Sequence, residues 1–376
     1  MEFPLGLAQV QRQLLLAKSL QLEGYEVTVL CRYGIHAQVA GIAPEGVFEG
    51  VHYIYCSGIT SRPESFIKRN ILKVKGLLGE IRHYRHYSKN EQLTGALVST
   101  NNFYNILFYF LLGKIFGVIT VVDNVEYWTS NSNFRGLDRL DKLLYDRFYY
   151  CFSDRVICIS DFLMNRISSS KRKRAIKIPA ITDFGKFQSK NPPVIFKGQK
   201  YFLYCGSEHY FDVIDFVIAT YESLGPTDIY LALITKMTEK LSTRLEVSLV
   251  KDKIKVLQNI PYPDLVNMYC FSEALIIPLR NNDQDKARFP HKISEYCASS
   301  RPIITNKVGE MSNYFDDTNS YLCDDYEEEE FADKLKQVIS DPETARLRSI
   351  RSYELGLREF NFSSYSKILK TFFQGK

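Results

Sequence analysis

The fold is decided by the stretch RFPHKISEYCASSRPIIT, which spans residues 288–305. It begins with cationic residues and a proline, continues as a short amphipathic helix, and enters an apolar strand after a second proline. Arg288, His291 and Lys292 flank the predicted helix N-terminus, where free backbone N–H groups and the positive end of the helix dipole attract phosphate. Glu295 lies one turn further along and can accept hydrogen bonds from paired hydroxyls such as those of a ribose. The stretch therefore predicts a site for a nucleotide sugar.

Outward from this stretch, short apolar runs alternate with segments of helical periodicity along the whole chain, which is the pattern of parallel α/β sheets. At 376 residues the chain is long for one domain, and two domains are the usual outcome. The composition becomes polar, with two prolines, between residues 183 and 199, and we place the linker between the domains there. We predict an α/β fold with two doubly wound, Rossmann-like domains that face a cleft, with the ligand at the carboxyl ends of both sheets.

The composition restricts the function classes. The net charge of +5 is mild, so we expect no binding to nucleic acid. No run of about 18 apolar residues predicts a membrane span, and no signal peptide is visible at Met1. The eight cysteines form no CxxC pair and no zinc spacing, and most lie in apolar surroundings typical of reduced core thiols. We therefore predict a cytoplasmic protein, either fully or as a peripheral protein on the inner face of the plasma membrane.

The stretch 288–305 resembles the signature of the GT-B glycosyltransferases, in particular the GT4-like group of retaining enzymes, the glycosyl transferases group 1. Members of that group often read phenylalanine-proline-x-lysine-x-x-glutamate-tyrosine, followed by a small-residue pair and a proline before a strand. In the family the glutamate, Glu295 here, contacts the donor ribose. Many members carry a second glutamate eight positions earlier, where this chain has Ala287.

The resemblance implies a GT-B architecture. An acceptor-side domain is expected over residues 1–185, a nucleotide-sugar-binding domain over residues 186–345, and a helical tail, residues 346–376, that crosses back to the first domain. In this fold a buried strand lies between the predicted strands Glu26–Cys31 and Ala96–Thr100, ahead of the first glycine loop. The sequence lacks that first strand, and we expect that an upstream start restores it.

Three further loops follow predicted strands of the second half and are candidates for the donor site. Gly206-Ser207 follows the first strand, where a glycine lets the backbone approach a diphosphate, although the lysine that comes next in the family is absent. Lys236 ends the next strand and either supplies the missing cation or is an ordinary surface lysine. Pro261 and Tyr262 lie in the loop that holds the nucleotide base in the family, and the tyrosine either stacks on the base or is a half-buried loop residue.

Arg288 and Lys292 are the predicted catalytic cations of this half. Negative charge develops on the β-phosphate as the nucleotide leaves, and a fixed guanidinium and ammonium stabilise it. The segment 283–285, Asp-Gln-Asp, has the letters of a DxD metal motif but lies in a polar loop. The resemblance implies no metal, and we expect no cofactor other than the nucleotide-sugar donor.

The first half offers fewer candidates. Gly6 lies at the start of a predicted helix, where the family has a glycine-rich loop that touches donor and acceptor. Asp123 and Glu126 follow a predicted strand, where many members have a histidine that is absent here. Either carboxylate could orient the acceptor or act as a base. The alternative is a carboxylate that stabilises the N-terminus of a helix.

A basic segment in the first half suggests a lipid surface. Residues 62–89 hold eight Lys or Arg and two Glu, with apolar residues interleaved at helical spacing. A basic amphipathic helix can lie on an anionic membrane. In GT-B enzymes that act on lipid-linked acceptors, this region is often the membrane-docking face. The alternative is a helix packed on its sheet with a solvated basic side.

We therefore predict a glycosyltransferase that moves a sugar from a nucleoside-diphosphate sugar to an acceptor hydroxyl. The expected acceptor is a saccharide or a lipid-linked saccharide in the synthesis of a bacterial surface polysaccharide, and the resemblance implies retention of configuration. Two alternatives remain open. One is a non-catalytic relative that binds a nucleotide sugar or a partner, which the missing family residues favour. The other is a sugar-nucleotide epimerase, which requires cleft carboxylates and histidines that this chain largely lacks.

Overall fold

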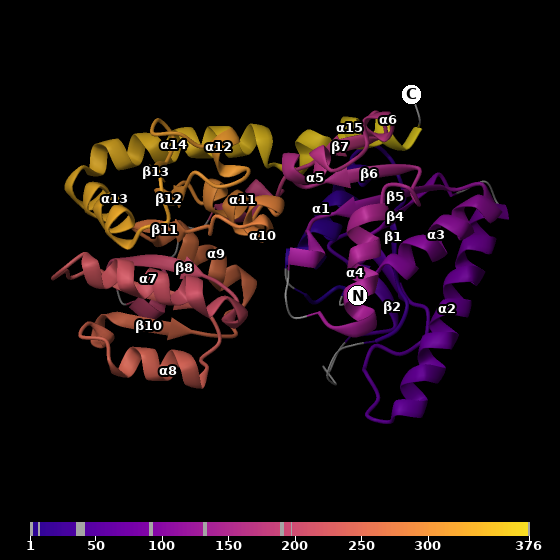
Figure 1. Cartoon of the computed structure of the whole chain (residues 1–376), viewed down its shortest axis with the longest axis horizontal. Helices are drawn as coiled ribbons and strands as arrows, with labels where there is room; N and C mark the ends of the chain where they lie inside the picture. Colours follow the sequence, from indigo (N-terminus) through magenta and orange to yellow (C-terminus); the bar gives the residue numbers. More distant parts are fainter. Residues whose placement is uncertain are drawn as a thin grey trace. The chain divides into compact units, whose positions relative to one another are not determined.

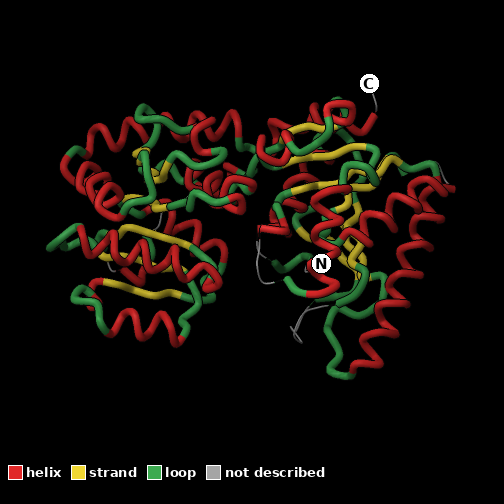
Figure 2. The backbone as a smooth tube through the Cα atoms, in the orientation of Figure 1, coloured by secondary structure: helices red, strands yellow, loops and turns green. Residues whose placement is uncertain are grey.

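The computed structural model describes residues 3–6, 8–34, 42–89, 93–130, 134–188, 192–196 and 198–374. The chain divides into two compact units, coloured along the chain in Figure 1 and traced in Figure 2. Unit 1 is Met1–Ile178 with Phe362–Lys376, and unit 2 is Pro179–Asn361. The sequence-based prediction has the boundary after residue 185 and the returning tail from residue 346. In the structure the chain enters unit 2 a few residues earlier, and a shorter tail returns to unit 1.

Unit 1 combines short strands with helices of very different lengths (Figure 1). Its strands are β1 (Thr28–Cys31), β2 (Glu45–Phe48), β3 (Val51–Tyr55), β4 (Gly95–Val98), β5 (Ile119–Asn124), β6 (Arg155–Cys158) and β7 (Ala175–Lys177). Its helices are α1 (Ala8–Gln21), α2 (Phe66–Lys89), α3 (Phe103–Phe116), α4 (Gly136–Phe148), α5 (Asp161–Asn165), α6 (Ser169–Arg172) and α15 (Ser366–Gln374), with short 3-10 turns at η1 (Trp128–Ser130) and η6 (Phe362–Tyr365).

The strands of unit 1 form two sheets, in the orders β1-β3-β2 and β4-β5-β6-β7. Neighbouring strands are parallel except β2, which runs antiparallel to β3. The turn between β2 and β3 places Glu49 and Gly50 at positive φ, 46° and 83°, which is the backbone that a tight two-residue hairpin requires.

β1 and β4 each end their sheet on one side. These are the two strands between which we expected a further strand, and no strand in the described part of the chain pairs with the second edge of either. Residues ahead of α1 pack beside the first sheet instead. Phe3 is fully buried, and its carbonyl oxygen accepts a 2.6 Å hydrogen bond from the Tyr55 hydroxyl.

Unit 2 alternates strands and helices regularly. Its strands are β8 (Tyr201–Cys205), β9 (Tyr230–Ile234), β10 (Ile254–Leu257), β11 (Ala274–Ile277), β12 (Ile303–Asn306) and β13 (Tyr321–Cys323). Its helices are α7 (Phe211–Ser223), α8 (Glu239–Glu246), α9 (Tyr262–Phe271), α10 (Asp283–Ala287), α11 (His291–Ala298), α12 (Met311–Tyr314), α13 (Glu328–Ser340) and α14 (Pro342–Glu359), with 3-10 turns at η2 (Phe184–Phe187), η3 (Val194–Phe196), η4 (Glu208–Tyr210) and η5 (Lys251–Lys253).

The six strands of unit 2 form one parallel sheet in the order β10-β9-β8-β11-β12-β13. β8 comes first in the chain and lies in the middle, so the direction of winding reverses between β8 and β11. In doubly wound sheets, ligands bind outside the carboxyl ends of the strands at this reversal. The order confirms the Rossmann-like fold predicted for the second half, and the loops after β8 and β11 become the first places to look for a site.

Candidate functional site

The loops after β8 and β11 bring two arginines and a tyrosine to the reversal point of unit 2. Tyr210 closes η4, directly after β8, while Arg280 lies three residues beyond β11 and Arg288 follows α10. Arg288 donates a 2.8 Å hydrogen bond from Nη1 to the Tyr210 hydroxyl. Both guanidinium groups also lie near the Tyr210 ring, 4.6 Å from its centroid for Arg288 and 5.5 Å for Arg280, within cation–π range.

Asp285 holds both arginines in place. Its carboxylate accepts bonds from Arg280 Nε at 2.9 Å, Arg280 Nη2 at 3.1 Å and Arg288 Nη2 at 2.5 Å, and from the backbone N–H of Arg280 at 2.9 Å. The Asp285 side chain is only 1% exposed. Burial alone would raise its pKa, but the hydrogen bonds and charges of the two arginines outweigh burial and hold the pKa below its ordinary value. Asp285 is therefore an ionised anchor for two cations.

This pairing bears on the Asp-Gln-Asp segment at 283–285. The Asp285 carboxylate faces arginines, which leaves it poorly placed to bind a metal ion. Within the described ranges, no group of three or more His, Cys, Asp or Glu side chains is arranged to hold a metal. Ala287, at the position of the family's first glutamate, is fully buried.

A second cluster surrounds the first turns of α11. The Tyr262 hydroxyl donates a 2.9 Å hydrogen bond to Glu295 Oε1, and His291 Nε2 lies 3.9 Å from the same oxygen. Glu295 is 4% exposed, which is more buried than a residue expected to line an open cleft. Burial raises its pKa to about 7, although the bond from Tyr262 and the charge of Lys292 act in the opposite direction. Three residues chosen from the sequence thus form one contact group.

The remaining candidates of unit 2 also follow strand ends. Ser207 caps η4 by accepting a hydrogen bond from the N–H of His209, at 3.4 Å. A Cβ atom on Gly206 would collide with the side chain of Tyr204, so packing next to β8 favours a glycine here whatever binds nearby. Lys236 is exposed two residues after β9, Pro261 precedes α9, and Lys292 is half-buried on α11.

In unit 1, one of the candidate site residues is held in a buried ion pair. Asp123, at the end of β5, is 2% exposed, and its two oxygens accept bonds of 3.0–3.2 Å from Arg12 on α1. Arg12 also donates a 3.0 Å bond to the Ile178 carbonyl. To serve as a base, Asp123 would have to break a buried ion pair, so it is better described as the anchor of α1. Glu126 is half-buried in the segment after β5, and Gly6 lies two residues before α1.

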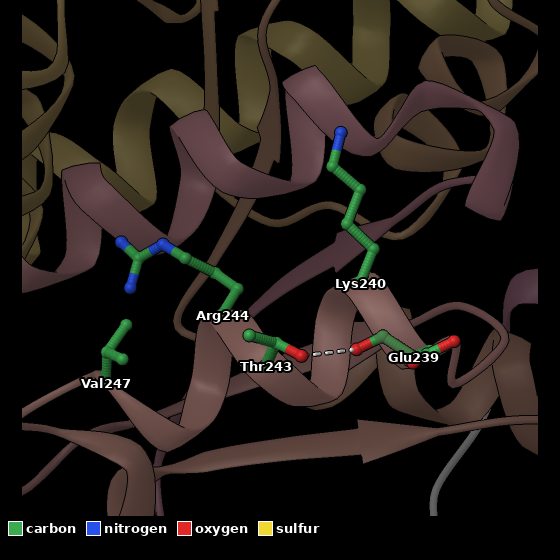
Figure 3. A pocket seen from close by; sticks show the side chains of 5 residues that line it. All are labelled: Glu239, Lys240, Thr243, Arg244 and Val247. Atoms are coloured by element: carbon green, nitrogen blue, oxygen red, sulfur yellow. Dashed lines mark hydrogen bonds between the residues drawn. The ribbon is translucent and has the colours of Figure 1, made fainter.

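One surface hollow lies away from these clusters. Figure 3 shows its lining side chains, which all come from α8 and the residue after it: Glu239, Lys240, Thr243, Arg244 and Val247. Arg244 forms ion pairs with Asp215 at 2.5 Å and Glu222 at 2.7 Å, which lie on the neighbouring α7. The hollow contains none of the residues chosen from the sequence and lies outside the reversal point of the sheet.

Comparison with known proteins agrees with this fold. A sucrose-phosphate synthase from Thermosynechococcus elongatus superposes with a TM-score of 0.70 at 15% identity, covering 96% of this chain and 91% of that one. HepE of Anabaena in complex with UDP and glucose gives 0.66 at 10% identity, covering 87% of each chain. A trehalose-6-phosphate structure from E. coli bound with UDP-2-fluoro glucose gives 0.66 at 12% identity, covering 100% and 97%. No curated protein matches the chain by sequence.

These likenesses define the class: the chain has the GT-B fold of glycosyltransferases, with two Rossmann-like domains. Residues 186–354, which lie within unit 2, match the family model described as glycosyl transferases group 1. Residues 186–354 thus carry a domain of the glycosyl transferases group 1, in agreement with the signature at 288–305.

Sequence reasoning did not find Arg280, Tyr210 or the role of Asp285. Arg280 could have been chosen from the sequence, because it follows an apolar strand by three residues. Lys236 was chosen for the same reason, since it too follows a predicted strand. The pairing of Asp285 with Arg280 had no such signal, since it depends on the path of the loop after β11.

Proposed function

We propose that the protein transfers a sugar from a nucleoside-diphosphate donor to a hydroxyl of a saccharide, with the donor bound at the carboxyl edge of the sheet of unit 2. One observation carries the proposal. Within the group 1 domain, Arg288 and Glu295 lie on either side of the start of α11, one fixed by Asp285 and the other by Tyr262. A fixed cation for phosphate just before α11 and a carboxylate for hydroxyls on α11 suit the two halves of a nucleotide.

The proposed chemistry is electrostatic. Arg288 and Lys292 stabilise the charge that develops on the leaving diphosphate, so the reaction proceeds without a metal or a further cofactor. Glu295 and Tyr262 hold the ribose and base, with His291 beside them and Pro261 shaping the turn. Gly206, Ser207 and Lys236 line the phosphate side. Retention of configuration follows from the resemblance to the GT4-like group.

In unit 1 we propose that Gly6 and Glu126 serve the acceptor. Glu126 has the better claim to orient a hydroxyl, because the other carboxylate of this segment, Asp123, is held by Arg12. Asp123 then acts indirectly, by fixing α1 and the short segment that carries Gly6.

The acceptor is proposed to be lipid-linked because of the way α2 is held. Its inner side approaches neighbouring backbone closely: a Cβ on Gly76 would collide with the Arg32 carbonyl, and Glu80 accepts bonds from Arg32 at 2.9 Å and Tyr109 at 2.8 Å. The only buried residues of α2 are Gly76, Glu80 and Tyr84. None of the first ten residues of α2 is buried.

The opposite side of α2 carries an exposed apolar stripe. Its members, spaced by four, three and four residues, share one face of a helix at 100° per residue and are 58–70% exposed: Ile67, Ile71, Val74 and Leu78. That direction is about 180° from Gly76 and Glu80. On the neighbouring α3, Leu111 and Ile115 are exposed as well. These four apolar residues of α2 thus face outward, whereas Tyr84 on the same helix is buried.

The charges of α2 favour an anionic lipid surface. The helix contains seven Lys or Arg, and its one acidic residue, Glu80, is buried against Arg32. An exposed apolar stripe on a helix rich in cations is typical of interfacial helices. No described helix has the length and the apolar character needed to span a bilayer. We therefore propose peripheral attachment to the inner face of the plasma membrane, in the synthesis of a surface polysaccharide.

A second candidate function is supported by Ala287. The family's first glutamate is replaced there by a fully buried methyl group, which favours a non-catalytic relative that binds a nucleotide sugar without transferring it. Incubation with a panel of nucleotide sugars, scored for binding and for release of free nucleoside diphosphate, separates the two. Binding without release in the presence of acceptor-containing membranes supports the non-catalytic candidate. Release that persists in a chelator supports the metal-free transferase.

A further inference from the structure

We infer that Arg280 is a ligand for the donor diphosphate and that Asp285 positions it together with Arg288. This inference rests on the proposed function, because it presumes that a nucleoside diphosphate binds at the reversal point of unit 2. It adds a residue that neither the signature at 288–305 nor the loops chosen from the sequence include.

The backbone that carries Arg280 is fixed from a neighbouring strand. The side-chain amide of Asn306, at the end of β12, accepts a 2.8 Å bond from the Leu279 N–H and donates a 2.8 Å bond to the Leu279 carbonyl. Asn306 is fully buried. Beyond it, Gly309 has φ +57°, and a Cβ there would lie 3.0 Å from the Lys286 Cα, so the loop after β12 lies tightly against α10. Arg280 and Asp285 are thus presented by segments with little freedom to move.

The guanidinium of Arg280 has one buried partner and one exposed partner. Nε and Nη2 bond to Asp285, whose side chain is 1% exposed, while Nη1 bonds at 2.6 Å to Asp212, whose side chain is 57% exposed. Of the five N–H donors of a guanidinium, these bonds use three. Ion pairs with an exposed carboxylate are weak because water competes for both groups. An incoming phosphate oxygen can therefore replace Asp212 while Asp285 keeps the guanidinium in place.

The charges of the two arginines and the two carboxylates around them balance only while Asp212 stays in place. The buried carboxylate of Asp285 is shared by Arg280 and Arg288, so the pair carries one positive charge more than the anchor neutralises. Asp212 compensates that excess from the exposed side. The Nε and Nη2 edge of Arg280 is taken by Asp285, so it is the Nη1 group, now bonded to Asp212, that can pass to an oxygen of a diphosphate.

Arg244 provides a matched control in the same unit. It also lies between two carboxylates, Asp215 at 2.5 Å and Glu222 at 2.7 Å, and its side chain is exposed to a similar degree. Arg244 itself lies on α8, whereas Arg280 lies just beyond the carboxyl end of β11. Arg244 has the contacts of a structural arginine without the position of a ligand.

The experiment measures binding by calorimetry of UDP, ADP and GDP, together with the monophosphate and nucleoside of whichever diphosphate binds. We expect Arg280→Gln to weaken diphosphate binding by tenfold or more and monophosphate binding by less. Binding of the nucleoside should stay within twofold, and Arg244→Gln should change none of the three. Equal diphosphate affinity in Arg280→Gln and the unmodified protein, or an equal loss in Arg244→Gln, overturns the assignment.

A second variant keeps the test decisive if Arg280→Gln unfolds. Asp212→Asn removes the exposed competitor without touching the buried anchor, so diphosphate binding should tighten by about twofold to fivefold while nucleoside binding is unchanged. Weaker diphosphate binding in Asp212→Asn would contradict the idea that a phosphate oxygen replaces Asp212 on Arg280. If the unmodified protein binds none of UDP, ADP and GDP, the result refutes the proposed function. It then says nothing against the role of Arg280 in particular.

Discussion

The Tyr262 hydroxyl donates a 2.9 Å hydrogen bond to the buried carboxylate of Glu295, and so joins the first residue of α9 to α11, the helix that carries the family signature. The two residues are 33 positions apart in the chain. In the proposed site, an arriving ribose takes over hydrogen bonds at this carboxylate, and the tyrosine lies beside it to contact the base.

The first prediction concerns nucleotide affinity. Glu295→Ala should weaken binding of the nucleoside diphosphate by about 1.5–3 kcal/mol, the range of a hydrogen bond to a charged group. Titration calorimetry measures it. Glu273→Ala is the matched control, because Glu273 directly precedes β11 and so lies at the opposite end of that strand from the site. Unchanged affinity in the Glu295 variant would remove this residue from the ribose site.

The raised pKa of Glu295 predicts a pH dependence of stability. Between its ordinary pKa of 4.5 and its folded pKa of about 7, the folded protein holds a proton on Glu295 that the unfolded chain has lost. The folded state binds more protons in this window, so this group's contribution to the free energy of unfolding falls as pH rises and stays low above about pH 7.

Glu295→Gln removes that titration and isolates its effect. Relative to the unmodified protein, the variant should gain about 2–3 kcal/mol in free energy of unfolding between pH 5 and pH 8. Urea denaturation of both proteins at the two pH values measures the change. A difference between them that does not vary with pH would show that Glu295 is ionised throughout.

The apolar stripe and the cations of α2 predict binding to vesicles. Replacement of Lys68, Arg69, Lys73 and Lys75 with glutamine should abolish binding to anionic vesicles, and binding of the unmodified protein should weaken as salt rises. Co-sedimentation measures both. The same charge change in unit 2, at the exposed Lys336, Arg346, Arg351 and Arg358, should leave binding intact. Binding that is absent, or independent of salt, would return α2 to a purely structural role.

The ion pair between Arg12 and Asp123 predicts a stability effect. Asp123→Ala should lower the free energy of unfolding by about 3–5 kcal/mol, because it leaves the Arg12 charge buried without its carboxylate. The double variant Arg12→Met with Asp123→Leu should lose much less, since it buries no unpaired charge. A loss below about 1 kcal/mol in Asp123→Ala, accompanied by loss of turnover, would instead support a chemical role for Asp123.

The sequence predicts unit 2 more fully than unit 1. β8, β10 and β11 can be recognised as short apolar runs in the sequence, because strands of a parallel sheet covered on both faces are rich in apolar residues. β2 was not predicted, since Glu45 and Gly46 weaken its pattern and its four residues alternate between exposed and half-buried.

Candidate site residues could be chosen from the sequence, but the contacts among them could not. The segment 288–305 carries a local signature, so Arg288, His291 and Glu295 could be chosen from spacing alone. The partner of Asp123 is 111 positions away, on α1, and no local pattern reports such a pairing. The burial of Glu295 likewise depends on Tyr262, which reaches it from another helix.

The most direct test of sugar transfer is the steady-state release of free nucleoside diphosphate from a nucleotide sugar in the presence of acceptor-containing membranes. The unmodified protein should release it with at least one donor. Arg288→Ala and Lys292→Ala should each lower kcat far more than they raise the donor KM, because the diphosphate gains charge as it leaves. Arg244→Ala should leave both constants unchanged. Tight binding of a donor with no release above the rate seen without protein would contradict the account and favour the non-catalytic relative.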